Sequence, residues 1–497
     1  MPDNLSRVCV IGAGLGGLAL AIRLQSAGVA TTLVEALDRP GGCARGWQQD
    51  GFSFDTGPAV ITDPASLQDL WHLSGQDMAG DVELLPVSPL TRFSWPDGSH
   101  FDLVRDEAAL RVQIARLAPG DLAGYEEFAE YAAQVQAEGF RYRAPATYLR
   151  LLNMVPALPA LLRLQFWRTL YGRVAGLVKS DKLRQVLSSA ALIIGGNPLT
   201  VSATYAVMHK REKDSGVWYA RGGNGQLAAG MADLFQRLGG TLRLSDAVVQ
   251  VHTLGNRASA VECVSGWREH FDAVASNGDL MHSYGDLLGG AARGATMARR
   301  LARKRWSPGL FAVHFTLDGA WPGIAHNTLL LGARYAGLLA DIYDYGVLPR
   351  DGMIWLSHPT VTDPSVAPPG KSLFRAVMPV ANLGKLPINW AEVGPRLERR
   401  IIDEVGLRFI PDIHDRIITR WHTTPRDHAQ SLHAWQGSAF SLEPLTSQSA
   451  WLRPRQRDAV IGNFYLVGAG TRPGAGVSSV VSGAHGVAKL MLEDMAK

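Results

Sequence analysis

The first forty residues follow the pattern of a βαβ unit. Residues 7–11 are a short β-branched run that ends at a glycine, and residues 31–34 are a second such run that ends at an acidic residue. Between them, apolar residues recur at helical spacing from Leu18 to Leu24. The order predicts a strand, a glycine-rich turn, a helix and a second strand.

A similar pattern returns near the other end of the chain. Residues 464–467 are an aromatic and β-branched run that enters a second glycine-rich turn, and residues 480–495 carry small residues in a helical pattern. Two strand-to-helix turns at opposite ends of the sequence suggest that both close on one long ligand.

The first turn has the spacing of a dinucleotide site. Gly12 permits a tight turn, Gly14 lets a pyrophosphate approach the backbone, and Gly17 permits close packing of the helix on the strand. The first amides of the helix and its dipole favour phosphate. Glu35 is placed to accept hydrogen bonds from the hydroxyls of a non-phosphorylated adenosine ribose.

A further glycine pair indicates which dinucleotide is bound. Gly41 and Gly42 follow the acidic residue closely, with Arg45 beside them to neutralise phosphate charge. Nicotinamide dehydrogenases do not usually need this second turn, whereas FAD enzymes of the glutathione-reductase type do. The late turn, with Gly468 and Gly470, would close on the cofactor from the other end.

Composition excludes several classes of protein. The 497 residues are 46% hydrophobic and 19% charged, with a net charge of +4. A disordered chain needs low hydrophobicity and high net charge, and a dedicated nucleic-acid binder needs a stronger basic excess, so we expect neither. The apolar stretch 151–162 is too short to span a bilayer, and no secretory signal is visible. The spacing of the 14 histidines and 3 cysteines predicts no metal site and fits a reducing cytoplasm.

One segment has an unusual charge pattern. Residues 139–180 contain seven Lys and Arg and no Asp or Glu, interleaved with leucines and interfacial aromatics. This pattern is typical of a segment that lies in a bilayer surface with anionic headgroups. The alternative is a pair of core-facing helices with solvated arginines.

These stretches resemble the bacterial phytoene desaturase family, FAD enzymes of carotenoid synthesis, over essentially the whole chain. The matching stretches are residues 10–24, 51–62, 195–198, 216–225, 438–444 and 466–476. The resemblance implies an α/β fold: a Rossmann-like FAD-binding domain of the glutathione-reductase/amine-oxidase type with an interleaved α+β substrate domain.

The resemblance also divides the chain between these two domains. Residues 1–75, 215–290 and 455–497 would form the discontinuous FAD-binding domain. Residues 76–214 and 291–454 would form the substrate domain, which associates with the membrane.

Site residues follow position by position from the resemblance. It implies that the following residues contact FAD: Gly12, Gly14, Gly17, Glu35, Gly41, Gly42, Val248, Gly468 and Gly470. Val248 would face the adenine from one strand over residues 242–251. The family's phosphate-binding arginine is replaced by Cys43, and Arg45 is expected to take over its role.

The implied reaction is desaturation of an acyclic carotenoid. A hydride passes from an allylic carbon to the flavin, a proton leaves the neighbouring carbon, and an apolar tunnel excludes water. Asn153 and Ala336 stand where family members carry polar groups proposed for acid–base work. Glu443 is a candidate base and Arg334 a candidate positioning group, with a structural ion pair as the alternative for both.

Several assignments stay open at this point. The alternatives are carotenoid isomerisation, desaturation of a thirty-carbon or late hydroxylated or methoxylated carotenoid, and a flavin-free escort protein that binds prenylated partners. The electron acceptor would be oxygen or a quinone. We expect a cytoplasmic protein associated peripherally with the inner membrane.

Overall fold

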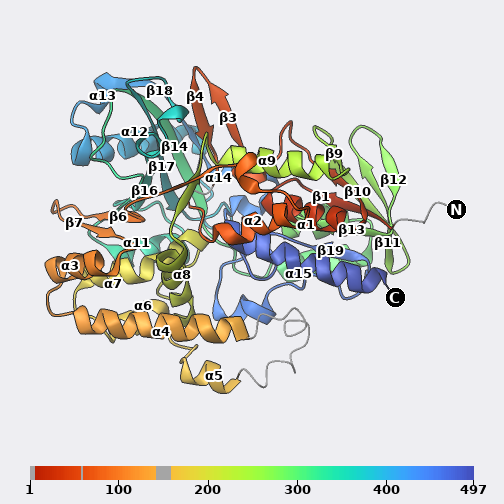
Figure 1. Cartoon of the computed structure of the whole chain (residues 1–497), viewed down its shortest axis with the longest axis horizontal. Coiled ribbons are helices and arrows are strands. Elements are labelled where there is room, and N and C mark those ends of the chain that lie inside the picture. The colour runs from red at the N-terminus through yellow and green to blue at the C-terminus, as the bar shows by residue number, and fades with distance from the viewer. Residues whose placement is uncertain (1–5, 58–59, 142–157, 497) are drawn as a thin grey trace.

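The computed structural model describes residues 6–57, 60–141 and 158–496. Two large sheets dominate it, a parallel sheet near the chain termini and an antiparallel sheet at the opposite end, with a helical layer beneath the latter (Figure 1).

The first sheet has five parallel strands in the order β19-β13-β1-β2-β9. Its strands are β1 (Arg7–Ile11), β2 (Ala30–Val34), β9 (Thr241–Arg243), β13 (Ala273–Ser276) and β19 (Phe464–Leu466). Strands from the beginning, middle and end of the sequence therefore lie side by side, which brings their carboxyl ends to one edge.

Both faces of this sheet are covered, as a parallel sheet requires. Val8 and Val10 of β1 pack into a core with α2 (Pro64–His72) and three longer helices, while Cys9 and Ile11 pack into a second core on the other face. The three helices are α1 (Leu15–Ser26), α9 (Asn224–Arg237) and α15 (Val477–Met495). The opposite face is covered by an antiparallel sheet of β10 (Val248–Leu254), β11 (Arg257–Cys263) and β12 (Arg268–His270).

The second large sheet has seven strands in the order β18-β14-β17-β16-β15-β6-β7. Its neighbours are antiparallel except for β15 and β6, which run parallel. The strands are β6 (Thr91–Ser94), β7 (His100–Leu103), β14 (Gly309–Asp318), β15 (Asn327–Leu330), β16 (Ile354–Ser357), β17 (Lys371–Val380) and β18 (Ile417–Thr423). One face packs on α12 (Trp390–Phe409) through Phe311, Phe315 and Leu397.

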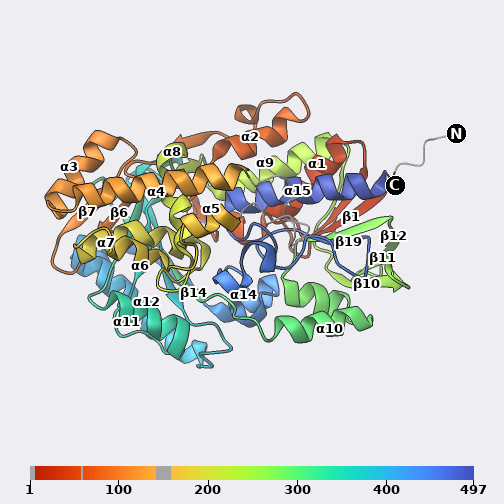
Figure 2. The same cartoon turned by 90° about the horizontal axis from the view of Figure 1, so that it is seen from below.

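A helical layer shares a large core with the β6–β7 end of this sheet (Figure 2). It consists of α3 (Glu107–Leu117), α4 (Leu122–Arg141), α5 (Leu158–Arg163), α6 (Leu170–Ala175), α7 (Asp181–Ser188) and α8 (Val207–Ser215). The remaining helices are α10 (Ala292–Leu301), α11 (Tyr335–Ala340), α13 (Ile413–Arg416) and α14 (Pro425–Leu432).

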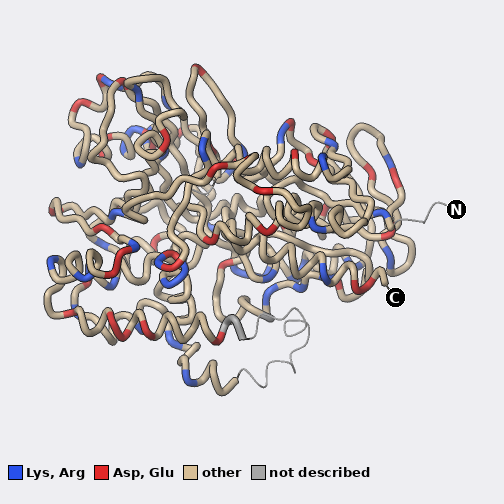
Figure 3. Tube along the Cα trace, viewed as in Figure 1, with Lys and Arg blue, Asp and Glu red and all other residues tan. Residues whose placement is uncertain are grey.

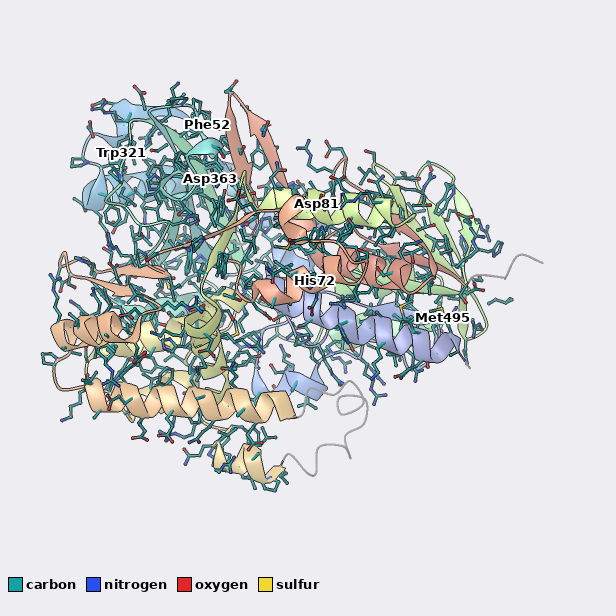
Figure 4. All side chains as sticks on the ribbon, in the orientation of Figure 1. Phe52, His72, Asp81, Trp321, Asp363 and Met495 are labelled. Carbon is teal, nitrogen blue, oxygen red and sulfur yellow. The ribbon has the colours of Figure 1, made fainter. Side chains whose placement is uncertain are left out.

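Short strand pairs join the two halves of the molecule. β3 (Gly46–Gln49) and β4 (Phe52–Asp55) form a hairpin, and β5 (Leu84–Pro86) pairs with β8 (Trp218–Ala220). The buried Asp363, from the side of the antiparallel sheet, accepts a hydrogen bond from the amide of Gly222, just before α9 (Figure 4). These contacts fix the two sheets relative to each other.

The single strand expected over residues 242–251 is wrong. β9 and β10 are separate strands in different sheets, because Ser245 adopts a positive φ of 56° and the chain turns between them. Asp246 stabilises this turn by accepting hydrogen bonds from the amide and hydroxyl of Ser265.

Across the described ranges, no helix is long and apolar enough to cross a membrane. The same residues contain no cluster of His, Cys, Asp and Glu that could hold a metal ion.

Candidate functional site

Four loops meet at the carboxyl edge of the parallel sheet. They follow β1, β2, β13 and β19. These strands are adjacent in the sheet although they come from the beginning, middle and end of the sequence. Three of the loops carry the glycines named from the sequence, and the fourth begins with Asn277.

The loop after β1 brings helix and strand into very close contact. A Cβ on Gly17 would lie 2.0 Å from the carbonyl oxygen of Gly12, far inside van der Waals distance. Gly12 itself has a φ of +93°, which favours glycine. Helix α1 begins with Gly14 as its N-cap and has no side-chain cap. Its first amides are therefore available to an anion.

Glu35 closes this loop from the end of β2. Its buried carboxylate accepts hydrogen bonds from the amides of Ala13, at 2.7 Å, and Leu37, at 3.0 Å. Burial raises the pKa of Glu35, and these amides and Arg45 act in the opposite direction. Val248 is buried in the same core as Ile11 and Val34, the last residues of β1 and β2.

The turn after β2 lies directly against the first turn. Gly41 is bridged to Gly14, and a Cβ on Gly42 would lie 3.2 Å from the Cα of Gly14. Beside this turn, Nη1 of Arg45 is buried and makes no hydrogen bond to any part of the chain that the structure describes. A guanidinium with a buried, open donor suits an anionic partner.

The turn after β19 reaches the same place from the other end of the sequence. A Cβ on Gly16 would lie 3.2 Å from the Cα of Gly468, and one on Gly470 would lie 2.5 Å from Leu280. Helix α15 begins with Gly476 as its N-cap and, like α1, has no side-chain cap. The first and late glycine turns, which the sequence analysis assigned to one ligand, therefore each lead into a helix without a side-chain cap.

Asn277 is a site residue that sequence reasoning missed. It follows β13, and its amide nitrogen Nδ2 donates to the carbonyl of Gly12 at 3.4 Å. Added Cβ atoms on Gly14, Gly16 and Gly468 would each lie within 2.7 Å of its side chain. Asn277 therefore spaces the first and last turns, and the only signal for it was a polar residue after an apolar strand.

Arg453 is a second missed residue. It is 3% exposed, and its guanidinium donates to the carbonyl of Ala469 at 2.7 Å within the late turn. Its Nε is buried without a hydrogen-bond partner in the described part of the chain. Like Arg45, it offers an open donor beside a glycine turn.

These features fit a flavin dinucleotide. Glycines without Cβ leave room along the loops, two helix starts and the open donor of Arg45 suit phosphates, and Glu35 suits a ribose. A flavin held there supplies two-electron redox chemistry. The chain's own contribution is to bind and orient that group and to exclude water around it.

Two cavities adjoin this cradle. The first lies between β4, the start of α9 and the antiparallel sheet. Its lining includes the buried His314 and His326 and the half-buried Asp55 and Arg375. Asp55 accepts from the amides of Asn224 and Gly225 at the start of α9, and burial lowers the pKa of Arg375 to about 10.

The second cavity lies at the start of α15. Val60, Ile193, Ile194, Met208 and Val477 line it together with Thr62, Arg211, Glu212, Gly476, Ser478 and Ser479. It is the cavity closest in sequence and structure to the late glycine turn.

The two candidate catalytic residues lie in neither cavity. Arg334 precedes α11 and is half exposed in ion pairs with Asp341, at 2.7 Å, and Asp351, at 3.0 Å. Glu443 is buried, and its carboxylate lies 3.0 Å from Nε of Arg305. Burial raises the pKa of Glu443, and Arg305 opposes this shift. Both geometries are those of structural ion pairs; Ala336 lies on α11 and Asn153 lies outside the described residues.

The cationic segment 139–180 is only partly described, since residues 142–157 lie outside the described ranges. The segment has acidic residues close to it in the structure, because α4 supplies glutamates that pair with its arginines (Figure 3). Arg163 pairs with Glu138 at 2.5 Å, and Arg173 pairs with Glu127 at 3.4 Å. Arg168 donates to the carbonyl of Gly172.

Comparison with known proteins places this arrangement in a family. The model of the flavin-containing amine oxidoreductases matches residues 15–492. A phytoene desaturase (lycopene-forming) from Paracoccus sp. is 49% identical over 98% of this chain and 97% of its own length. The chain belongs to the phytoene desaturase family of flavin-containing amine oxidoreductases.

Two more distant relatives carry the same product or another one in their names. A lycopene-forming phytoene desaturase from Pseudescherichia vulneris is 43% identical over 99% of this chain and 100% of its own length. A neurosporene-forming one from Cereibacter sphaeroides is 37% identical over 98% and 95%.

The fold of the phytoene desaturase family agrees with solved structures of flavin amine oxidases. Cyclohexylamine oxidase from Brevibacterium oxydans superposes with a TM-score of 0.63, at 18% identity, over 99% of this chain and 100% of its own. The expected Rossmann-like fold of the amine-oxidase type is confirmed, and so is a flavin cofactor.

Proposed function

We propose that this protein is an FAD-dependent phytoene desaturase that introduces conjugated double bonds into phytoene and releases lycopene. The observation that carries the proposal is the contact of the first and late glycine turns at Gly16 and Gly468, from which α1 and α15 both start without a side-chain cap. The near-full-length identity to lycopene-forming relatives supports the substrate and the product.

FAD, rather than a shorter flavin, suits the length of the cradle. Glu35 and the turn after β1 offer a place for an adenosine ribose and a pyrophosphate, which a flavin mononucleotide lacks. The late turn at Gly468 and Gly470 would then lie toward the flavin end.

The chain acts on its substrate mainly through positioning. A hydride must leave one carbon of the substrate toward the flavin and a proton must leave the next carbon, so both C–H bonds need a fixed orientation in a dry site. The apolar lining of the second cavity suits a hydrocarbon chain.

Expression in a carotenoid-free host supplied with phytoene, a thirty-carbon precursor or a late carotenoid tests the proposal. We expect phytoene to be converted to a product with lycopene's absorbance and mass, and the purified protein to release FAD. Isomers of unchanged mass would favour an isomerase. Conversion of only the thirty-carbon precursor or the late carotenoid would show that this compound, and not phytoene, is the substrate. A colourless protein that takes up no flavin would favour the escort-like alternative.

A membrane surface is the proposed working site, on the cytoplasmic side of the inner membrane. Three large apolar side chains around α5 are exposed, Leu158 at 48%, Leu162 at 49% and Trp167 at 57%. Together with the nearby arginines, they suit insertion at a headgroup boundary. Because Arg163 and Arg173 already have acidic partners, the apolar residues are the sharper target for a test.

Co-sedimentation with anionic liposomes provides that test. Replacing Leu158, Leu162 and Trp167 with Ser should reduce the bound fraction severalfold, whereas Leu407→Ser, at an exposed position on α12, should not. Equal binding of both variants would remove this reason for membrane association. The final electron acceptor is proposed to be a membrane quinone or oxygen, which reoxidation rates with each would distinguish.

A further inference from the structure

The cavity at the start of α15 contains one acidic side chain, Glu212 of α8. Glu212 is 5% exposed, although its neighbours Lys210, Lys213 and Asp214 are more accessible. The rest of the lining is apolar or neutral except for Arg211, which comes from the same helix.

Glu212 has no partner for its charge. Among the described residues, its carboxyl group makes no ion pair and no hydrogen bond, and Arg211 does not pair with it. Buried carboxyl groups in proteins are normally paired, so an unpaired one inside a cavity calls for a ligand or a reaction. Glu443, also buried, differs in having an ion-pair partner, because Arg305 lies 3.0 Å from it.

The position of Glu212 relates it to the flavin cradle. Gly476, Val477 and Ser478, which begin α15, line the same cavity and follow the late glycine turn. The lining also includes Val60 and Thr62, which follow β4 in the sequence, and residues of the 3-10 helix Ser189–Ile194. A hydrocarbon that reached the cradle through this cavity would pass Glu212.

We propose that Glu212 is the proton acceptor of the desaturation reaction. The inference rests on the proposed function and assigns a residue to its acid–base step, in place of Glu443. It uses the one buried, unpaired carboxyl group that lines a described cavity beside the start of α15.

The step balances as follows in atoms and electrons. One C–H bond of the substrate breaks, and its hydrogen leaves with both electrons as a hydride to the bound flavin. The C–H bond on the neighbouring carbon breaks, its proton passes to a carboxylate oxygen of Glu212, and its electron pair forms the new double bond. The proton returns to water, and the two electrons leave on a quinone or oxygen.

The surroundings of Glu212 determine how the reaction depends on pH. Burial raises the pKa of Glu212 to about 8, and no neighbouring charge contributes to the shift. The other charged or titratable groups on α8 are His209, Lys210, Arg211, Lys213 and Asp214, and the residues of other elements that line the cavity carry no titratable group. A proton acceptor must start as the carboxylate, so flavin reduction should accelerate as the pH rises toward and through about 8.

Glu212→Gln tests the inference because it keeps the shape of the side chain and removes its basicity. In anaerobic mixing of the flavin-loaded protein with phytoene, we expect flavin reduction to slow by roughly 100-fold or more and to lose its pH dependence. Glu212→Asp should restore part of the rate. Glu392→Gln, at an exposed carboxyl on α12, is the matched control and should behave like the unsubstituted protein.

A second measurement does not depend on turnover. Infrared spectra of the protein should show the C=O stretch of a protonated carboxyl group that disappears as the pH rises through about 8, and this signal should be absent in Glu212→Gln. This readout stays informative even if the variant binds flavin poorly.

The outcomes separate the two proposals. A Glu212→Gln protein that reduces flavin at the original rate with the original pH profile would overturn the role of Glu212 and leave the proposed function intact. Absence of a titrating carboxyl signal would also overturn it. If the unsubstituted protein fails to oxidise phytoene, the proposed function fails first.

Discussion

The close contact between Gly17 and Gly12 makes Gly17→Ala a demanding test of the cradle. The added Cβ would lie 2.0 Å from the carbonyl oxygen of Gly12, whereas real Cβ atoms stay at least 3.0 Å away. Helix α1 must therefore move by about 1 Å, and it packs tightly against β1, α9 and α15 in one core.

The size of the effect follows from opposing contributions. Overpacking of this kind costs about 1–3 kcal/mol, and alanine regains about 0.5–1 kcal/mol over glycine within a helix. The fold without flavin should therefore lose about 0–2.5 kcal/mol of unfolding free energy. Flavin binding should suffer more, because the first amides of α1 move away from the pyrophosphate, and a loss of about 1.4–3 kcal/mol corresponds to a 10- to 100-fold weaker Kd.

Purified protein can be assayed by its ratio of flavin to protein absorbance and by flavin titration of the apoprotein. Gly80→Ala is the matched control, because nothing lies within 4 Å of the Cβ it adds. We expect the control to retain its flavin and Gly17→Ala to be purified largely without it. A Gly17→Ala protein with unchanged flavin affinity would refute the reasoning that this contact positions the cofactor.

Three further results are expected. Because burial raises the pKa of Glu212 from 4.5 to about 8, the unfolding free energy of the apoprotein should fall as the pH rises from about 4.5 to 8. The loss amounts to at most about 5 kcal/mol. In denaturant titrations, Glu212→Gln should abolish this part of the pH dependence. Arg45→Met should weaken flavin binding roughly tenfold without lowering the melting temperature of the apoprotein, since it removes a buried donor that lacks a partner; unchanged affinity in a flavin titration would contradict this. Asn277→Leu should lower flavin occupancy at purification, because its side chain separates Gly14, Gly16 and Gly468, and full occupancy would count against that role.

The parts of the cradle that could be predicted from sequence depend on the backbone. Gly12, Gly17 and Gly41 are needed because of positive φ angles or missing Cβ atoms, and such requirements appear directly in the sequence. Glu35 follows from the fixed length of a βαβ unit. The strand predicted over residues 242–251 is instead broken in its middle by a turn at Ser245, held by Asp246.

Features that depend on tertiary contacts could not be predicted in this way. The acids that neutralise Arg163 and Arg173 come from α4, outside the segment whose charges had been counted. Glu212 lies in a run of charged residues, 210–214, that is typical of a solvated helix face. The sequence therefore contains no sign that this side chain is buried. Asn277 and Arg453 are single residues whose importance comes from the segments packed around them.

The central claim is tested most directly by anaerobic mixing of the flavin-loaded protein with phytoene in anionic liposomes. Each new double bond should be matched by the two-electron reduction of one flavin, so loss of oxidised-flavin absorbance should equal the desaturated product measured by mass. Repeated reoxidation by a quinone should carry the product through to lycopene. Flavin that remains oxidised while phytoene is unchanged, or product that forms without flavin reduction, would contradict the account.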